Sequence, residues 1–152
     1  MRKSVLLAAV FVAIILGFCG LGHGASWQEI DKNPQNYPGM EEYKAIYGNF
    51  LEDSRRAESG GELNDVRAEY IEEYKKFIKR FSKSEFTDEV KLRIAELYEL
   101  SEQKGRALPY LNDIIKNHPN ADYYPLGDKK DSGRKTADWA RYYLRDWFRI
   151  KK

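Results

Sequence analysis

The segment from residue 93 to residue 119, RIAELYELSEQKGRALPYLNDIIKNHP, indicates how this chain folds. It carries small, aromatic and aliphatic residues at helical intervals: Ala95, Tyr98, Ala107, Leu111, Ile114 and Ile115. Residues three and four apart share one face of an α-helix, so these side chains form two apolar faces. Small residues on such faces let two antiparallel helices approach to about 8–10 Å. The segment therefore predicts a packed helical hairpin.

The same helical spacing of apolar residues continues through the rest of the chain and predicts five helices. The first helix is expected at residues 41–57 and the fifth at residues 135–152. The second should start at Asn64 or Asp65, and the third should start at Ser84 or Thr87 and end at Gly105. The fourth should stop at Pro119. No apolar run after residue 40 alternates with period two, as a half-buried strand requires. We therefore expect an all-α protein.

The first 24 residues differ from the rest and predict a secretory signal peptide. Two basic residues precede an apolar run from Val5 to Phe18, and small residues follow. This order is typical of an export signal, and the run is shorter than the roughly 20 residues of a membrane span. We expect cleavage before Ala25. The predicted organisation is a signal peptide at 1–24, an irregular lead-in at 25–40 and a helical domain at 41–152.

Cys19 allows a second interpretation of the same segment. The sequence LGFC resembles a bacterial lipobox, in which the cysteine is lipidated and becomes the first residue of the mature protein. Such boxes carry a small residue just before the cysteine, whereas Phe18 is large. The expected location is therefore the periplasm after cleavage, and the alternatives are an outer-membrane lipoprotein or a secreted protein. A lipid on Cys19 would be the only contact with a membrane.

The charge balance and the cysteine count restrict the possible partners. The chain has 26 basic and 24 acidic residues, and both excess charges, Arg2 and Lys3, lie in the predicted signal peptide. The mature chain is then close to neutral, whereas nucleic-acid binding usually needs a strong basic excess. It would also keep one histidine, His118, and no cysteine. A disulfide, a zinc cluster and a Cys-His nucleophile are excluded, and we expect no cofactor.

The spacing in the opening segment resembles the tetratricopeptide repeat, a helix-turn-helix unit of about 34 residues. Residues 88–121 fit one frame of this repeat, with the alanines at its two small sites. A second helix of a preceding unit matches Tyr70–Ser82, and a first helix of a following unit matches Thr136–Trp147. Two residues depart from the pattern. Lys91 stands where the family has a large aromatic residue, and Pro109 is compatible only with the first turn of a helix.

The segment YKKFIKRFSKSEFTDEVKLRIAELYE (74–99) also resembles repeats of bacterial envelope proteins, such as outer-membrane assembly lipoproteins and repeat proteins of the Tol-Pal system. In those proteins an aromatic-rich turn joins successive units. The predicted export signal agrees with such a location. The resemblance therefore implies a short solenoid of stacked antiparallel hairpins that works in the cell envelope.

A tetratricopeptide-like solenoid implies a groove lined by residues of its first helices. In this frame those residues are Glu89, Leu92, Glu96, Glu99 and Leu100 on the third helix, and Arg134, Ala137, Arg141, Leu144 and Arg145 on the fifth. An acidic strip would then face a basic one and hold a peptide with charges of both signs. The aromatic residues of the last helix are either contact sites or a cap over the core. The expected partner-binding residues are Leu92, Glu96, Glu99, Arg141, Arg145 and Trp147.

The predicted function is therefore non-catalytic binding or scaffolding of a protein or peptide in the bacterial cell envelope. The alternatives are a lipid-anchored structural subunit of an outer-membrane complex, or a small envelope enzyme with its site in the 120–135 loop. The carboxylates lie on expected polar faces, without the burial or crowding that supports hydrolysis. In the loop, lysines follow Asp128 at positions where a calcium site needs oxygen ligands.

Overall fold

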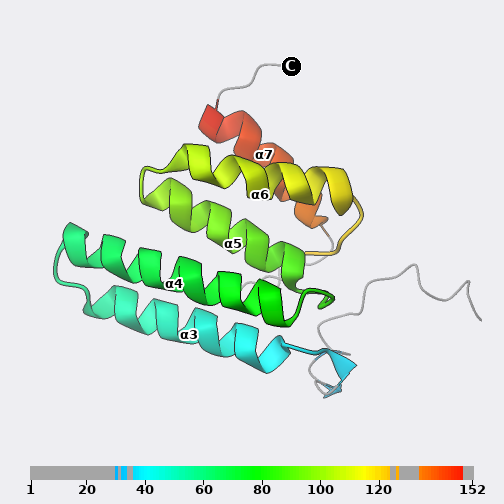
Figure 1. Ribbon diagram of the computed structural model, residues 1–152, viewed down its shortest axis with the longest axis horizontal. Coiled ribbons are helices and arrows are strands. Elements are labelled where there is room, and N and C mark those ends of the chain that lie inside the picture. Colours follow the sequence, from blue (N-terminus) through cyan, green and yellow to red (C-terminus); the bar gives the residue numbers. More distant parts are fainter. Residues whose placement is uncertain (1–29, 31, 34–35, 124–125, 127–133, 149–152) are drawn as a thin grey trace, which may run out of the picture.

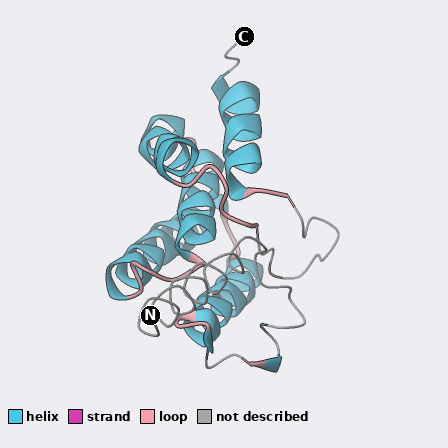
Figure 2. Cartoon of the chain, turned by 90° about the vertical axis from the view of Figure 1, so that its right-hand side faces the viewer, coloured by secondary structure: helices cyan, strands magenta, loops and turns pink. Residues whose placement is uncertain are grey.

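The computed structural model describes residues 30, 32–33, 36–123, 126 and 134–148 (Figure 1). Its named helices are α3 (Met40–Arg56), α4 (Gly60–Arg80), α5 (Thr87–Leu100), α6 (Lys104–Asn117) and α7 (Thr136–Phe148). Within the described residues there is no strand, only an isolated antiparallel bridge between Asp122 and Lys135 (Figure 2). The prediction of an all-α fold with five helices is therefore confirmed for this part of the chain.

The helices pack in chain order, with α5 in the middle. Each helix contacts the next one along the chain, and α5 also contacts α7. Figure 1 shows α3 and α4 as one antiparallel pair, α5 and α6 as a second pair beside it, and α7 at the far end. The first pair is complete: α3 is the helix predicted at 41–57, although the repeat pattern had matched only the second helix of this pair. Because α4, α6 and α7 pack around α5, most of the residues of α5 are buried.

The buried residues of α5 and α6 agree with the hairpin predicted from the opening segment. Ala95 and Ala107 have no exposed surface, and the two helices that carry them pack against each other. The ring of Tyr98 lies 6.1 Å from that of Tyr110 on α6, centroid to centroid. Leu111 is also completely buried. The two small residues therefore lie in the core, as close helix packing requires.

The start of α4 differs from the prediction. The hydroxyl of Ser59 accepts a hydrogen bond from the backbone N–H of Glu62 at 3.2 Å, and the carboxylate of Glu62 accepts one from the backbone N–H of Glu58 at 2.7 Å. This reciprocal pair is close to a capping box, and it starts the helix at residue 60. The predicted cap at Asn64 or Asp65 is wrong, because the serine cap outweighs the two glycines that follow it.

The residues expected to cap α5 serve the preceding turn instead. Thr87 is the first residue of the helix, and its hydroxyl donates to the carbonyl of Phe81 at 2.8 Å. The hydroxyl of Ser84 accepts from the backbone N–H of Phe86 at 3.3 Å. The N-cap position belongs to Phe86, which makes no side-chain cap. Both hydroxyls therefore fasten the turn between α4 and α5.

The end of α5 lies at Leu100 and not at Gly105 as predicted. Glu102 adopts a left-handed conformation with φ 60°. Its N–H donates to the carbonyl of Glu99 at 2.9 Å, and the N–H of Gln103 donates to that of Tyr98 at 2.7 Å. These two bonds form the Schellman motif that ends many helices, with glutamate at the position where glycine is usual.

Replacing Glu102 by Gly is expected to raise the free energy of unfolding by about 1 kcal/mol, because glycine adopts positive φ without a Cβ clash. Chemical denaturation with circular dichroism would measure the change. The matched control is Glu102→Ala, which removes the same charge and keeps the Cβ. A gain in stability of equal size in both variants would show that the charge, and not the backbone conformation, sets the cost.

At two further positions, Gly39 and Pro109, the surroundings explain why the backbone accommodates a glycine or a proline. Gly39, the N-cap of α3, has φ 89°, and a Cβ there would lie 2.9 Å from the ring of Phe77. Pro109 lies inside α6 beyond its first turn, so the expectation that this proline is compatible only with the first turn of a helix is wrong. The proline is exposed, and a solvent-facing side of the helix tolerates the loss of one backbone hydrogen bond. The predicted stop at Pro119 is confirmed, since α6 ends at Asn117 and His118 is its C-cap.

Several predictions lie outside the described residues. They concern the signal peptide at 1–24, lipidation of Cys19, the loop carboxylate of Asp128, and the end of the fifth helix after residue 148. Most of the 120–135 loop also lies there. Among the helices that the structure does describe, none is both long and apolar enough to cross a bilayer.

Candidate functional site

A polar cluster around Arg93 connects α5 with its neighbours. Nη1 of Arg93 donates a hydrogen bond to the carboxylate of Glu96 at 2.8 Å. Nη2 donates to the hydroxyl of Tyr123 at 3.4 Å, and it also lies 3.8 Å from the carboxylate of Glu89. The guanidinium also lies over the ring of Tyr47 on α3, 5.4 Å from its centroid. The side chain of Arg93 is 17% exposed and that of Glu89 is 0% exposed. Two carboxylates therefore share one guanidinium in a mostly buried place.

Tyrosine hydroxyls complete the hydrogen bonding of these two carboxylates. Tyr43 on α3 donates to Glu89 at 2.7 Å, and Tyr143 on α7 donates to Glu96 at 2.6 Å. Burial is the main cause that raises the pKa of both hydroxyls above the usual range, and the neighbouring carboxylate raises it further. Both tyrosines therefore remain neutral donors and connect α3 and α7 to the central helix. We call Arg93, Glu89, Glu96, Tyr43 and Tyr143 the Arg93 cluster.

Alkaline pH is expected to unfold the protein and to ionise its tyrosines in the same transition. Burial raises the pKa of Tyr43, Tyr70, Tyr74 and Tyr143 well above the ordinary value of 10.0. A raised folded-state pKa gives stability that is complete below pH 10 and is lost as the pH rises further, because only the unfolded chain ionises there.

The measurement is a pH titration that follows helical circular dichroism and tyrosinate absorbance together. The two signals should change over one pH range. The Tyr143→Phe variant keeps the ring and removes the hydroxyl, so its free energy of unfolding should fall less steeply above pH 10. Ionisation of the buried tyrosines in a fully folded chain would contradict the prediction.

A second polar cluster fills the position where the family pattern expects an aromatic residue. Nζ of Lys91 lies 3.1 Å from Asp88, 2.7 Å from Asp113 on α6 and 3.2 Å from Nε2 of His118. Nδ1 of His118 lies 3.1 Å from Asp88. Burial alone lowers the pKa of Lys91, but hydrogen bonds to the two aspartates outweigh it and raise that pKa. The lysine therefore joins α5 to the end of α6 as a paired cation.

The residues predicted to bind a partner on α5 have different environments. Leu92 has no exposed surface, so its side chain belongs to the core and we leave it out of the candidate site. Glu96 is 19% exposed and bonds to Tyr143, whose ring stacks on that of Trp147 at 4.3 Å between centroids. Glu99 is 25% exposed and lies 3.3 Å from Nζ of Lys104. The structure thus brings Glu96 and Trp147 together through one tyrosine.

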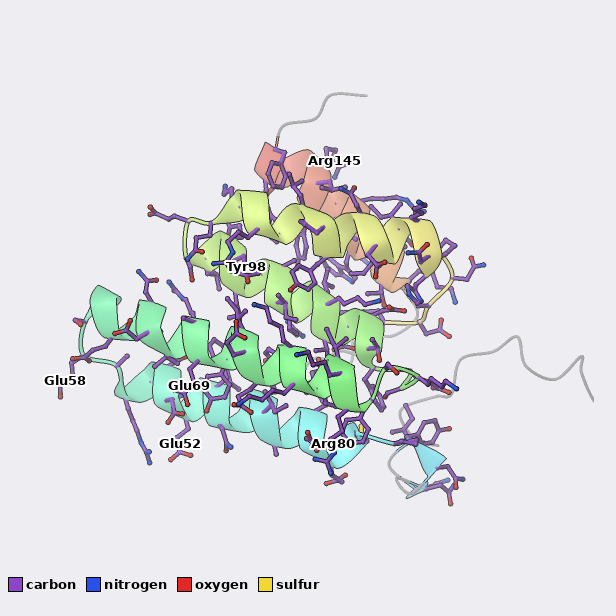
Figure 3. All side chains as sticks on the ribbon, viewed as in Figure 1. Glu52, Glu58, Glu69, Arg80, Tyr98 and Arg145 are labelled. Atoms are coloured by element: carbon purple, nitrogen blue, oxygen red, sulfur yellow. The ribbon has the colours of Figure 1, made fainter. Side chains whose placement is uncertain are left out.

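The two predicted arginines lie on the exposed face of α7, apart from this group. Arg141 donates to Asp138 of the same helix at 2.9 Å, and the guanidinium of Arg145 lies over the ring of Tyr142, 5.5 Å from its centroid. No ion pair between the described residues joins either arginine to Glu96 or Glu99. Figure 3 shows Arg145 at the α7 end of the molecule, far from Glu52 and Arg80 on the first pair of helices.

Arg93 was missed by sequence reasoning, although it contacts Glu89, Glu96, Tyr47 and Tyr123. The prediction placed the acidic residues of α5 on a solvent-facing strip, and Glu89, which it assigned to the groove, is only 1% exposed. Ala137 of the predicted groove is also completely buried. A sequence signal did exist. Tyrosines at 43, 47, 74 and 143 recur on the apolar faces of the predicted helices, and tyrosine hydroxyls need partners when buried.

Neither a metal site nor a known relative points to a reaction. No group of three or more metal-ligating side chains is close enough to hold a metal ion among the described residues. Comparisons with protein-family models, with curated proteins and with solved structures find no match to this chain. The function must therefore be inferred from packing, charge and exposed surface.

Proposed function

We propose that this chain is a non-catalytic, tetratricopeptide-like module that binds a polypeptide in the bacterial cell envelope. The observation that carries the proposal is the packing order. The pairs α3–α4 and α5–α6 follow each other, α7 comes next, and α5, the first helix of its pair, contacts α7 directly. Stacked helical hairpins make such contacts between neighbouring units, and the complete burial of Ala95 on α5 and Ala107 on α6 fits close packing of this kind.

The proposed peptide-binding surface runs along α5 and α7. Glu96, Glu99 and Trp147 are partly exposed there, and the Tyr143–Trp147 stack offers aromatic area next to a carboxylate. Aromatic residues are enriched at the centre of protein interfaces, and charged residues are more common at the rim. The Arg93 cluster underneath fixes the position of Glu96, so the surface is preorganised for a partner.

The envelope location is supported by the order of basic, apolar and small residues in the first 24 positions. Mass spectrometry of the protein made in a bacterial host would test it. A chain that begins at Ala25, or at a lipidated Cys19, supports export. A cytoplasmic chain that keeps the whole segment would contradict this part of the proposal.

Site-specific photo-crosslinking in living cells tests the binding surface. A photoreactive amino acid at Glu99 or Trp147 should give a discrete crosslinked product with one envelope polypeptide. The matched control is Glu69 on α4, an exposed residue on another helix, which should not give that product. The same product from all three positions, or none from the first two, would speak against the proposal.

A further inference from the structure

The outward face of α7 carries charges in an order that is complementary to itself. Four residues at intervals of three and four share this face, and we call them the α7 face: Asp138, Arg141, Tyr142 and Arg145. All four are exposed, and α7 packs on α6 and α5 through its other side. Figure 1 shows α7 as the last helix of the stack. The face therefore has an acidic end and a basic end about two turns apart.

The charged groups at both ends of the α7 face are able to take a further partner. Nη1 of Arg141 donates to one carboxylate oxygen of Asp138 at 2.9 Å, and the other oxygen has no partner among the described residues. The guanidinium of Arg145 lies over the ring of Tyr142, 5.5 Å from its centroid, and forms no ion pair with a described residue. A guanidinium stacked on a ring keeps its N–H edge for a carboxylate. A contact across an interface therefore requires no contact within the chain to break.

Tyr142 gives the α7 face an apolar centre. It is 43% exposed and is one of the two large hydrophobic residues that are exposed in the described part of the chain. Tyr142 and Asp138 also line a cavity of about 300 Å³, which leaves room beside the carboxylate for a side chain from outside. Arg134 and Trp139 complete the lining, and these two stack on each other at 5.1 Å. The α7 face thus combines an aromatic centre with opposite charges at its two ends.

The packing of the earlier helices indicates how a further helix would lie on α7. Figure 1 shows that helices in each pair, α3 with α4 and α5 with α6, run antiparallel. A helix that packs next on α7 in the same way would run antiparallel to it. A two-fold axis perpendicular to α7 produces this arrangement from a second copy of the chain, because the rotation reverses the direction of the helix. A second copy can therefore supply the antiparallel neighbour that α7 lacks in the described chain.

We propose that the α7 face is the interface of a weak homodimer, in which the α7 helices of two copies pack antiparallel about a two-fold axis. The axis passes between Arg141 and Tyr142, midway between Asp138 and Arg145. Asp138 of each copy then faces Arg145 of the other copy, and the two Tyr142 rings meet beside the axis. Moving the second helix by one residue would bring Asp138 opposite Asp146 in one direction, and Arg141 opposite its own symmetry mate in the other. The order of charges therefore specifies this register.

The length of α7 limits the strength of the dimer. The helix has 13 residues, which corresponds to about 20 Å. A contact between two such helices buries less than the roughly 1,200 Å² at the lower limit of standard interfaces, so we expect a reversible dimer with a micromolar Kd. The proposal goes beyond the proposed function and does not rest on it, because Tyr143, which bonds to Glu96 in the peptide-binding surface, points to another side of α7.

Sedimentation equilibrium of the chain purified from a bacterial host tests the dimer, at concentrations from about 1 to about 500 μM, which bracket a micromolar Kd. The variants are Asp138→Arg, Arg145→Asp and the two combined, which has the composition of the native chain. Each single change places like charges opposite each other at both ion pairs, and the double change restores opposite charges. The matched control is Arg55→Asp, at an exposed position of α3. Circular dichroism checks that every variant keeps the native helix content.

We expect the native chain, the double variant and Arg55→Asp to dimerise alike, and each single variant to dimerise at least about tenfold more weakly. An equal mixture of the two single variants should form a heterodimer with nearly native affinity, because every ion pair across the axis then joins opposite charges. A native chain that stays monomeric, single variants that dimerise as the native chain does, or a mixture that associates no better than its components would each overturn the proposal. The crosslinking result at Glu99 is independent of all three outcomes, so the proposed function can fail or hold separately.

Discussion

The Ala95→Trp variant is expected to lose about 3 kcal/mol or more of its free energy of unfolding. Ala95 has no exposed surface on α5, the helix that contacts α4, α6 and α7 at once. An indole ring there would force the helices apart, and overpacking of a tight core costs about 1–3 kcal/mol even for smaller additions. A loss of 3 kcal/mol or more corresponds to a fall in melting temperature of about 12 °C or more for a small domain. Thermal unfolding followed by circular dichroism measures it.

The control for this prediction is Ala68→Trp. Ala68 is an exposed residue of α4, so the same indole would extend into solvent there and change the stability by no more than about 0.5 kcal/mol. If Ala95→Trp melted at the same temperature as Ala68→Trp, the close approach of α5 to its neighbours would be wrong. The proposed stacking of hairpins would then lose its main support.

The helices could be predicted from the sequence because their apolar residues repeat at intervals of three and four. Ala95, Ala107 and Leu111 fall on these faces, and all three are buried. The periodicity identifies one buried face for each helix. It does not show that a helix has neighbours on three sides, which is why the burial of Leu92 and Glu89 on α5 was not foreseen.

Helix ends were predicted less well, because they depend on single hydrogen bonds. The cap at Ser59 and the left-handed Glu102 each decide where a helix begins or ends. A glycine in the sequence, such as Gly105, only permits such an end, and the backbone can place it elsewhere. The termination at His118 and Pro119 was predicted because a proline cannot continue the backbone hydrogen bonding of a helix.

The candidate site could be predicted only in part, since a charged residue in a sequence is normally assigned to solvent. That rule holds for Arg141 and Arg145, which are exposed. It fails for Arg93, which contacts Glu96 three residues along the same helix and also Tyr47 and Tyr123, 46 and 30 residues away in the chain. Contacts between residues so far apart in the chain follow from how the helices pack, and no local pattern contains them.

The Arg93→Met variant is expected to lose about 3–5 kcal/mol of stability, the usual cost of removing one partner from a buried ion pair. Methionine keeps much of the length of the side chain and removes its charge. Glu89, with a completely buried side chain, would keep its hydrogen bond from Tyr43 and lose its nearest cation. Chemical denaturation of the variant, compared with Arg55→Met on the surface of α3, measures the effect.

A double variant separates this electrostatic cost from the loss of packing. In Arg93→Met combined with Glu89→Gln, the buried charge is gone and the amide oxygen still accepts from Tyr43. If the charge of Glu89 is the source of the damage, the double variant is more stable than Arg93→Met alone, with a coupling of about 1–3 kcal/mol. If the free-energy changes of the two substitutions were strictly additive, Arg93 would stabilise the fold through the ring of Tyr47 and through Glu96, and not through Glu89. The hydrogen bond from Tyr43 would then be enough to stabilise the buried carboxylate of Glu89.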